Sequence, residues 1–269
     1  MVLALWTPLA GAEPNRAPPE DELRKKVEVR ASSGLRRGLK ILGEDARAVF
    51  GAPARWRRRG WSVFGSVLAA TALVYAYDEE IRDQVRESSA PDRKNFADGI
   101  AVLGRAEVGA VLPWVSYGLA SAAGSTRFKR SSLVAFEAWV LSAAATAALK
   151  GASARLAPPD GDGNDFWKGG DVFPSGHTAR TFAIAAVFAE RHGARAAWIG
   201  YPVATLVGLA RIETNAHWAS DVVAGAALGI SIGRAVARRH PIARETGRQG
   251  PPLWMLQPVP GGLLVRLSF

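Results

Sequence analysis

The sequence predicts an all-α protein, a bundle of six core helices with a short C-terminal β-hairpin. The first observation is a series of apolar stretches, rich in Ala, Leu and Val, whose lengths are typical of helices. The second is a composition with 28 Gly and 48% hydrophobic residues, unusually Ala- and Gly-rich for a soluble enzyme. The third is a change of pattern after Pro241, where two short apolar stretches flank a Gly-containing turn.

The composition also narrows the classes of function. The chain of 269 residues has no cysteine, which excludes disulfides and thiolate metal sites and is compatible with any compartment. Its net charge of +10 indicates anionic partners, such as nucleic acid, anionic lipid or phosphorylated substrates. No signature of a nucleic-acid-binding fold accompanies this charge. Because much of it is arginine near the first apolar stretch, we expect a membrane surface and no nucleic acid as partner.

The chain divides into three segments. Residues 1–33 form a tail or remnant signal segment with a Pro-rich linker, residues 34–240 a helical domain, and residues 241–269 an extension with the hairpin. Ala10-Gly11-Ala12 resembles a signal-peptidase site, although the basic region that precedes such sites is missing and the apolar core is short. A truncated signal peptide and a disordered tail are both open interpretations of residues 1–12.

An amphipathic pattern and a basic aromatic segment precede the core. Apolar residues recur at helical spacing over residues 35–50, in a helix that packs on the core by default or lies on a membrane. Arginines then alternate with tryptophans from Arg55 to Trp61. This pattern is typical of a lipid headgroup interface, and the alternative is a solvated run of charge beside core aromatics.

The core helices follow in order. The first apolar run has 17 residues without a charge, the lower limit for crossing the hydrocarbon core. The next two contain Arg105, Glu107 and Glu137, which are costly in lipid unless paired or buried in protein. On the last, Gly225, Gly229 and Gly233 stand four residues apart, a spacing that lets helix backbones approach closely. The six predicted helices cover residues 61–77, 96–123, 131–150, 175–191, 194–211 and 220–239.

The segment Pro174-Ser175-Gly176-His177 carries the first chemical signal. Ser175 is a good N-cap for the helix that follows, and Gly176 allows the backbone to approach a ligand. A helix N-terminus presents free N–H groups and a positive dipole end to an anion. On these four residues alone, the favoured interpretation is an ordinary capped helix whose His177 packs or is solvated.

A second segment strengthens the signal. Arg211 lies six residues before His217, and Asp221 lies four residues after it. If a helix begins near His217, the Asp221 carboxylate shares its face and can accept the imidazole N–H, which raises the basicity of the other nitrogen. Such pairs serve in metal sites, proton relays and triads. A serine hydrolase would need a nucleophile elbow, which is missing, and a metal site would need more ligands. Lys150 and Arg155, near the end of an apolar helix, are candidates for a charge clamp.

The ordered set of these residues resembles the type 2 phosphatidic acid phosphatase (PAP2) superfamily, over about residues 45–239. The family pattern is a Lys, six residues and Arg-Pro, then Pro-Ser-Gly-His, then Ser-Arg, five residues, His, three residues and Asp. Pro158 matches the Pro of Arg-Pro, and Arg155 matches an Arg that often precedes it. The chain departs from the pattern in its first and third motifs, with Ala157 in place of Arg, Ala154 in place of a frequent Gly and Ala210 in place of Ser.

The resemblance implies a mechanism and its residues. His217 would attack phosphorus to form a phosphohistidine, Asp221 would orient it, and His177 would act as general acid. No metal or cofactor is implied, because fixed cations and hydrogen-bond donors would hold the phosphate oxygens. These phosphate-binding residues would be Lys150, Arg155, Ser175, Gly176 and Arg211.

The sequence therefore predicts a metal-independent phosphatase that hydrolyses a phosphomonoester or pyrophosphate, with a lipid as the expected substrate because of the apolar helices. The alternatives are a soluble phosphatase, a vanadate-dependent haloperoxidase and a non-catalytic envelope protein with a degenerate site. We expect a bacterial cell envelope protein, inner-membrane or periplasmic, with its site facing the periplasm. Arg55–Arg59 favours a cytoplasmic side for that end of the first run, whereas a cleaved signal peptide would favour the periplasm. Nothing in the sequence indicates the oligomeric state.

Overall fold

The computed structural model describes residues 36–161, 165–242, 254–259 and 262–267. The chain separates into two compact units, one of residues 41–249 and one of residues 1–40 with 250–269, and each is described by itself. The predicted tail or signal segment, residues 1–33, lies outside the described residues.

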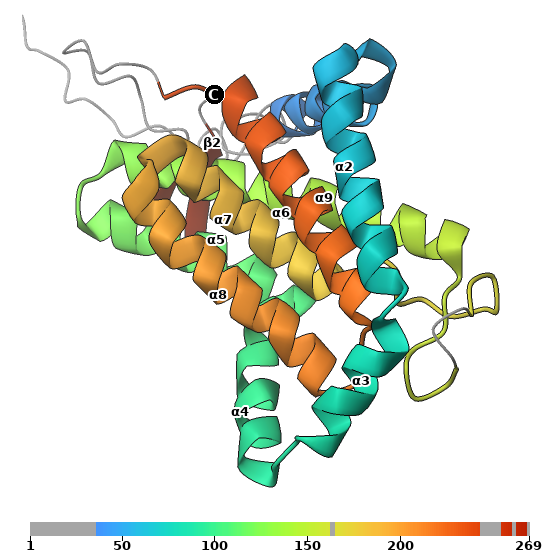
Figure 1. The fold of residues 1–269 in the computed structure, drawn as a ribbon. Coiled ribbons are helices and arrows are strands. Elements are labelled where there is room, and N and C mark those ends of the chain that lie inside the picture. The colour runs from blue at the N-terminus through green and yellow to red at the C-terminus, as the bar shows by residue number, and fades with distance from the viewer. Residues whose placement is uncertain (1–35, 162–164, 243–253, 260–261, 268–269) are drawn as a thin grey trace, which may run out of the picture. The chain divides into compact units, whose positions relative to one another are not determined.

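The larger unit is helical. A first helix covers residues 36–50. Figure 1 shows the helices that follow, several of which run side by side. In order they are η1 (Pro53–Arg55), α2 (Arg58–Tyr75), α3 (Asp78–Glu87), α4 (Pro91–Ala101), η2 (Val102–Gly104), α5 (Ala106–Ala122), α6 (Thr126–Ser153), α7 (Gly176–His192), α8 (Ala194–Glu213) and α9 (Ala219–Arg239).

Helix α7 is the centre of this unit, because it packs against α6, α8 and α9. The glycines of α9 make the closest approach. A Cβ on Gly225 would lie 2.6 Å from the carbonyl oxygen of Ser175, and Cβ atoms on Gly229 and Gly233 would collide with the carbonyls of Ala179 and Ala183. The predicted packing role of the glycine stripe is therefore confirmed. This contact brings the N-terminal end of α9 beside the N-terminal end of α7.

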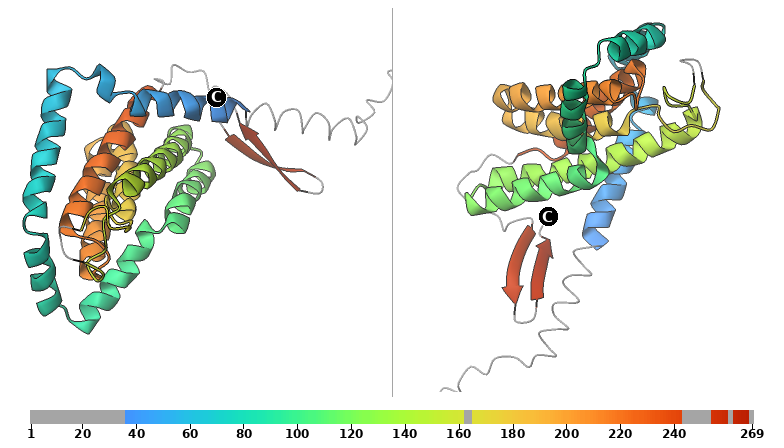
Figure 2. Two further views of the ribbon diagram at one scale, coloured as in Figure 1. Left: turned by 90° about the vertical axis from the view of Figure 1, so that its right-hand side faces the viewer. Right: turned by 90° about the horizontal axis from the view of Figure 1, so that it is seen from below.

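Two bent helix pairs flank that core (Figure 2). The axes of α2 and α3 differ by 52°, and those of the α4–η2 segment and α5 by 63°. The prediction of one helix over residues 96–123 is therefore wrong, and α3 is a helix that the predicted count of six did not include. At the break, Gly104 packs closely on other helices, because a Cβ there would lie 2.6 Å from Val207 and 2.9 Å from the Cβ of His177. Only glycine therefore fits at this position of the bend without a shift of its neighbours.

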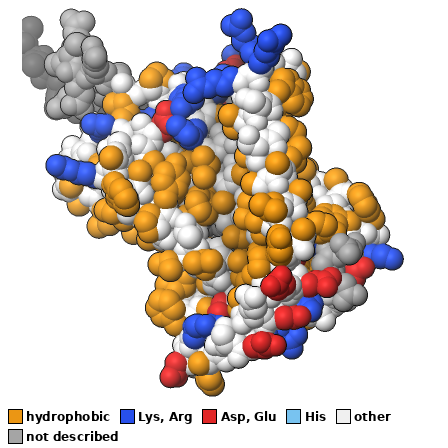
Figure 3. Space-filling view, in the orientation of Figure 1, with side chains coloured by type: hydrophobic (Ala, Val, Ile, Leu, Met, Phe, Trp, Pro, Cys, Tyr) orange, Lys and Arg blue, Asp and Glu red, His pale blue; other side chains and the backbone are white. Residues whose placement is uncertain are grey.

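Several helices have membrane dimensions. Among the described residues, α6 and α9 are long and apolar enough to cross a bilayer, and each bent pair could add one further span. Helix α2 has no buried residue, and its Trp61, Val63 and Leu68 are exposed. Hydrophobic side chains cover much of the face seen in Figure 3, including α2, while Lys and Arg side chains gather mainly at the top of this view. This distribution is typical of a helix that faces lipid.

The smaller unit contains a two-stranded antiparallel sheet. Strand β1 (Trp254–Val259) pairs with β2 (Gly262–Leu267), and Trp254 lies opposite Leu267 while Val259 lies opposite Gly262. Both strands lie in the predicted extension of residues 241–269, and β2 begins at Gly262, within the predicted turn.

Candidate active site

Three segments that are far apart in the sequence meet at one end of the helical core. The backbone N–H of Ser175 donates to the carbonyl of Asp221 at 2.9 Å, which joins the start of α7 to the start of α9. The indole of Trp218 donates to the carbonyl of Leu156 at 3.0 Å, which joins α9 to the chain after α6. The three segments that carry the sequence motifs are thus in direct contact.

His217 and Asp221 form the predicted pair. Helix α9 begins at Ala219, just after His217, and Nδ1 of His217 lies 3.5 Å from Oδ2 of Asp221. The same oxygen accepts the backbone N–H of Trp218 at 2.9 Å, which turns the carboxylate back toward the start of the helix. The Nδ1–Oδ2 distance exceeds that of a normal hydrogen bond, and catalytic contacts of this kind often shorten when substrate binds.

Asp221 is held by a buried ion-pair network. Arg155 donates from Nη1 to Oδ1 of Asp221 at 2.6 Å and from Nη2 to Oδ2 of Asp78 at 2.7 Å. Asp78 also accepts the backbone N–H of Ser220 at 2.9 Å and its hydroxyl at 2.5 Å. All four side chains are buried. Burial of such charges is tolerated because each has a partner of opposite charge and further hydrogen bonds.

Arg155 has buried partners that the sequence did not predict. Its side chain is 0% exposed, and its two Nη atoms donate to Asp78, Asp221 and the Ser220 hydroxyl. Its guanidinium also stacks on the rings of Tyr75, Phe166 and Trp218. A guanidinium enclosed in this way acts on Asp221, so the structure gives no support to a direct contact between Arg155 and a phosphate.

Positive charges converge on His177 at the first turn of α7. Burial and the charges of Arg211, Arg180 and Lys150 lower the pKa of His177 to about 3. The pKa of His217 is also lowered, chiefly by burial and against the opposing effect of Asp221. Both imidazoles are therefore neutral at neutral pH in the free protein. This cationic environment is the one that a bound phosphate requires.

The remaining predicted residues lie around this cluster. Ser175 occupies the N-cap position of α7 and is fully buried, but its hydroxyl accepts from Thr178 at 3.0 Å and does not cap the helix. Gly176 is the first residue of α7, where N–H groups are free of helical partners. Lys150, in the last turn of α6, lies 3.5 Å from the exposed carboxylate of Asp171.

Sequence reasoning missed two residues here. Asp78 directly follows the helix predicted over residues 61–77, and the structure shows that it begins α3 and holds Arg155 and Ser220. Its contacts are far away in sequence, so no local pattern could reveal them. Arg180 was visible as a cation one helical turn after Gly176, on the same face of α7.

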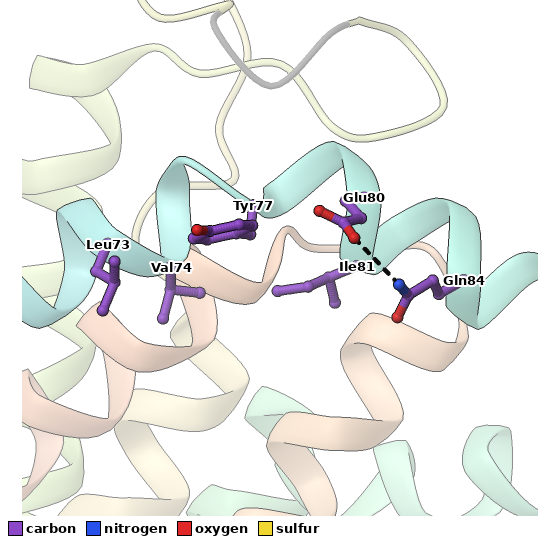
Figure 4. A pocket seen from close by; sticks show the side chains of 6 residues that line it. All are labelled: Leu73, Val74, Tyr77, Glu80, Ile81 and Gln84. Carbon is purple, nitrogen blue, oxygen red and sulfur yellow. Dashed lines mark hydrogen bonds between the residues drawn. The ribbon is translucent and has the colours of Figure 1, made fainter.

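An open hollow of about 490 Å³ lies at the bend between α2 and α3 rather than at the two histidines. Figure 4 shows Val74 and Ile81 on one side of the bend, and Gln84 donating to Glu80. Asp78 stands within this bend and reaches the site through Ser220. The hollow is lined by Leu73, Val74, Tyr77, Glu80, Ile81 and Gln84.

Comparison with known proteins agrees with the motifs. The model of the PAP2 superfamily matches residues 131–245. A lipid A 1-phosphatase of Porphyromonas gingivalis is 52% identical over 64 residues, which are 23% of this chain and only 14% of that protein. The crystal structure of a transmembrane PAP2 type phosphatidylglycerolphosphate phosphatase from Bacillus subtilis matches with a TM-score of 0.52 at 20% identity, over 65% of this chain and 94% of that chain. This second likeness shows a shared fold.

Proposed function

We propose that the chain, whose residues 131–245 match the model of the PAP2 superfamily, is a metal-independent phosphatase acting on the phosphate of a lipid. The observation that carries the proposal is the meeting of His217, backed by Asp221, with the cations that surround His177. A nucleophile and a cationic cradle are what phosphoryl transfer needs.

In the first step, Nε2 of His217 attacks phosphorus and the ester P–O bond breaks. A proton on Nδ1 that faces Asp221 leaves the lone pair of Nε2 free for this attack. The leaving oxygen takes a proton from His177. In the second step, water attacks phosphorus, the P–N bond breaks, and His177 accepts the proton of that water. The products are the dephosphorylated lipid and inorganic phosphate.

The cradle would hold the three equatorial oxygens of the phosphoryl group. We assign this role to Lys150, Arg211, the Ser175 hydroxyl and the N–H of Gly176. Arg155 receives a different role, since its contacts make it a positioning residue that fixes Asp221 behind His217. Fixed cations stabilise the charge of the transition state without reorganisation, so this chemistry needs no metal ion.

His177 gains its proton with the substrate. In the free site its pKa is about 3, because of burial and the surrounding cations. A phosphate dianion in the cradle opposes those positive charges and favours the imidazolium form. Substrate binding therefore prepares the general acid, and departure of phosphate releases the proton again.

A lipid substrate is supported by the apolar surface around the site. Exposed apolar residues cover α2, and the hollow at the α2–α3 bend offers Leu73, Val74 and Ile81 to an acyl chain. The named relatives are phosphatases of lipid A and of phosphatidylglycerolphosphate, so these two headgroups are the first to test. We further propose an inner-membrane or periplasmic location in a bacterial envelope, with the site facing the periplasm.

The test is hydrolysis by the purified full chain in detergent with EDTA present. Release of inorganic phosphate is followed from lipid A, phosphatidylglycerolphosphate, phosphatidate, a polyprenyl pyrophosphate and p-nitrophenyl phosphate. We expect turnover of at least one lipid, inhibition by orthovanadate, and loss of activity in His217→Ala. Arg234→Gln, which removes an exposed charge paired with Glu190 on the surface of α9, is the matched control. Activity that disappears with EDTA, or persists in His217→Ala, would refute the proposal.

A further inference from the structure

One cation of the site belongs to none of the sequence motifs. Arg180 lies on α7, three residues after His177. Its Nη2 donates to the carbonyl of Gly104 at 3.2 Å. Its Nη1 lies 3.2 Å from the position that a Cβ on Gly176 would occupy, so the guanidinium passes over the first residue of the helix.

These contacts direct Arg180 toward the reacting groups. Gly104, which accepts its hydrogen bond, packs so closely on His177 that an added Cβ would lie 3.1 Å from the imidazole Cδ2. The guanidinium therefore spans from Gly176 to the chain that covers His177. Among the charges that lower the pKa of His177, Arg180 is second to Arg211. The charge of Arg180 also contributes to lowering the pKa of Arg211, behind burial and the charge of Arg105.

The positive charge of Arg180 lacks a full counter-charge within the described part of the chain. There, its guanidinium makes one hydrogen bond, to the Gly104 carbonyl, and its buried Nε has no partner. Glu107 is near enough to raise the pKa of Arg180 but makes no ion pair with it among the described residues. A partly buried cation of this kind is stabilised by an anionic ligand. A guanidinium suits phosphate in particular, because two of its N–H groups can donate to two phosphate oxygens at once.

Another position explains why the site would use this residue. Ala157 stands where the family pattern has a phosphate-binding Arg, and Arg155 is committed to Asp78 and Asp221. The geometry points to Arg180 as a phosphate-binding residue that supplies the guanidinium missing at Ala157. This inference rests on the proposed function of the same site, and it adds a residue from α7 to the cradle.

The experiment measures orthovanadate binding by the full chain in detergent with EDTA, using ⁵¹V NMR so that no turnover is needed. Arg180→Gln removes the charge but keeps an amide that can donate to Gly104, and Arg234→Gln is the control. We expect Arg180→Gln to bind orthovanadate on the order of 10- to 100-fold more weakly, as for loss of one hydrogen bond to a charged group. An unchanged dissociation constant in a variant with wild-type melting temperature would overturn the inference.

A double-mutant cycle with Ala157→Arg tests the substitution of one guanidinium for another. We expect Ala157→Arg to strengthen orthovanadate binding more in the Arg180→Gln background than in the wild type. The reason is that either guanidinium would donate to the same oxygen of vanadate, so the second one adds little when the first is present. Equal effects in the two backgrounds would show that Arg180 does not fill that role. If Arg180→Gln does not fold, the cycle is run with Arg180→Lys. Equal effects of Ala157→Arg in the wild type and in Arg180→Lys would again show that Arg180 does not fill that role. A wild type that binds orthovanadate but hydrolyses no substrate would refute the proposed function and leave this comparison intact.

Discussion

Arg155 donates from Nη1 to Oδ1 of Asp221 at 2.6 Å, and both side chains are 0% exposed. The other Nη of Arg155 binds Asp78, at the bend between α2 and α3. A chain of charges thus runs from Asp78 through Arg155 and Asp221 to His217. It fixes the proposed nucleophile to a part of the molecule that lies about 140 residues earlier in the sequence.

This relationship predicts different defects for two kinds of arginine. Arg155→Lys keeps a positive charge but loses the two-sided contact, so we expect kcat to fall at least about tenfold while inorganic phosphate binds as in the wild type. Arg211→Lys should instead weaken the inhibition by phosphate, because its side chain would touch the anion. Steady-state kinetics with phosphate as competitive inhibitor measure both. Weaker phosphate inhibition in Arg155→Lys, at unchanged melting temperature, would assign Arg155 to the cradle after all.

The two arginines show what the sequence could and could not predict. Motif spacing correctly marked the segments that meet, because a His four residues before an Asp and a Pro-Ser-Gly-His turn are local patterns. The direction of a side chain is not local. Arg155 turns toward Asp78, a partner 77 residues away, and only the packed structure decides between that carboxylate and a phosphate.

The same limit applies to the fold. The long apolar patterns of α6 to α9 predicted their helices closely, because each buries a face in the core. The break between η2 and α5 was missed, because a single glycine is tolerated within a helix and the contact of Gly104 with His177 is far away in the sequence. Arg105 and Glu107 marked the place without showing that the chain bends there.

The C-cap of α6 offers a test of stability. Ala154 adopts a left-handed conformation with φ 43° and ψ 39°, where a Cβ costs about 1–2 kcal/mol. Ala154→Gly should therefore raise the free energy of unfolding by about 0.5–1 kcal/mol after the extra entropy of the unfolded glycine chain is subtracted. Ala152→Gly, within the helix, is the matched control and should lower stability. Thermal unfolding in detergent measures both, and a destabilised Ala154→Gly would contradict the conformation.

Proton uptake should accompany the binding of a dianion. The pKa of His177 is about 3 in the free site and is raised when an anion opposes the surrounding cations. Between the free and the raised pKa, the bound state holds a proton that the free state lacks, so binding strengthens as pH falls through this window. Sulfate is a suitable probe, because it stays a dianion over this range. Calorimetry in buffers of different ionisation enthalpy counts the protons.

His177→Gln is the control for this measurement. It should bind sulfate without the proton uptake that we assign to His177, and its affinity should depend less on pH. Equal proton uptake in the wild type and in His177→Gln would show that another group titrates, and would remove the basis for His177 as general acid.

The hollow at the α2–α3 bend distinguishes a lipid substrate from a soluble one. Filling it with Ile81→Trp should raise KM for a phosphorylated lipid roughly tenfold or more. The reason is that the indole would occupy the hollow, so the acyl chain could no longer bury its apolar surface there. Hydrolysis of p-nitrophenyl phosphate should stay within about twofold of the wild type, because it has no chain to place there. Val203→Trp, at an exposed apolar position of α8, is the control. An equal loss with both substrates would indicate damage to Asp78 rather than a lipid site.

The central claim is that His217 becomes covalently phosphorylated, and the stereochemical course at phosphorus tests it most directly. A substrate with a chiral, isotopically labelled phosphorothioate group is hydrolysed in labelled water, and the configuration of the thiophosphate product is determined. Two in-line displacements, one by His217 and one by water, predict overall retention. Inversion would show a single direct attack by water and would contradict the phosphohistidine mechanism.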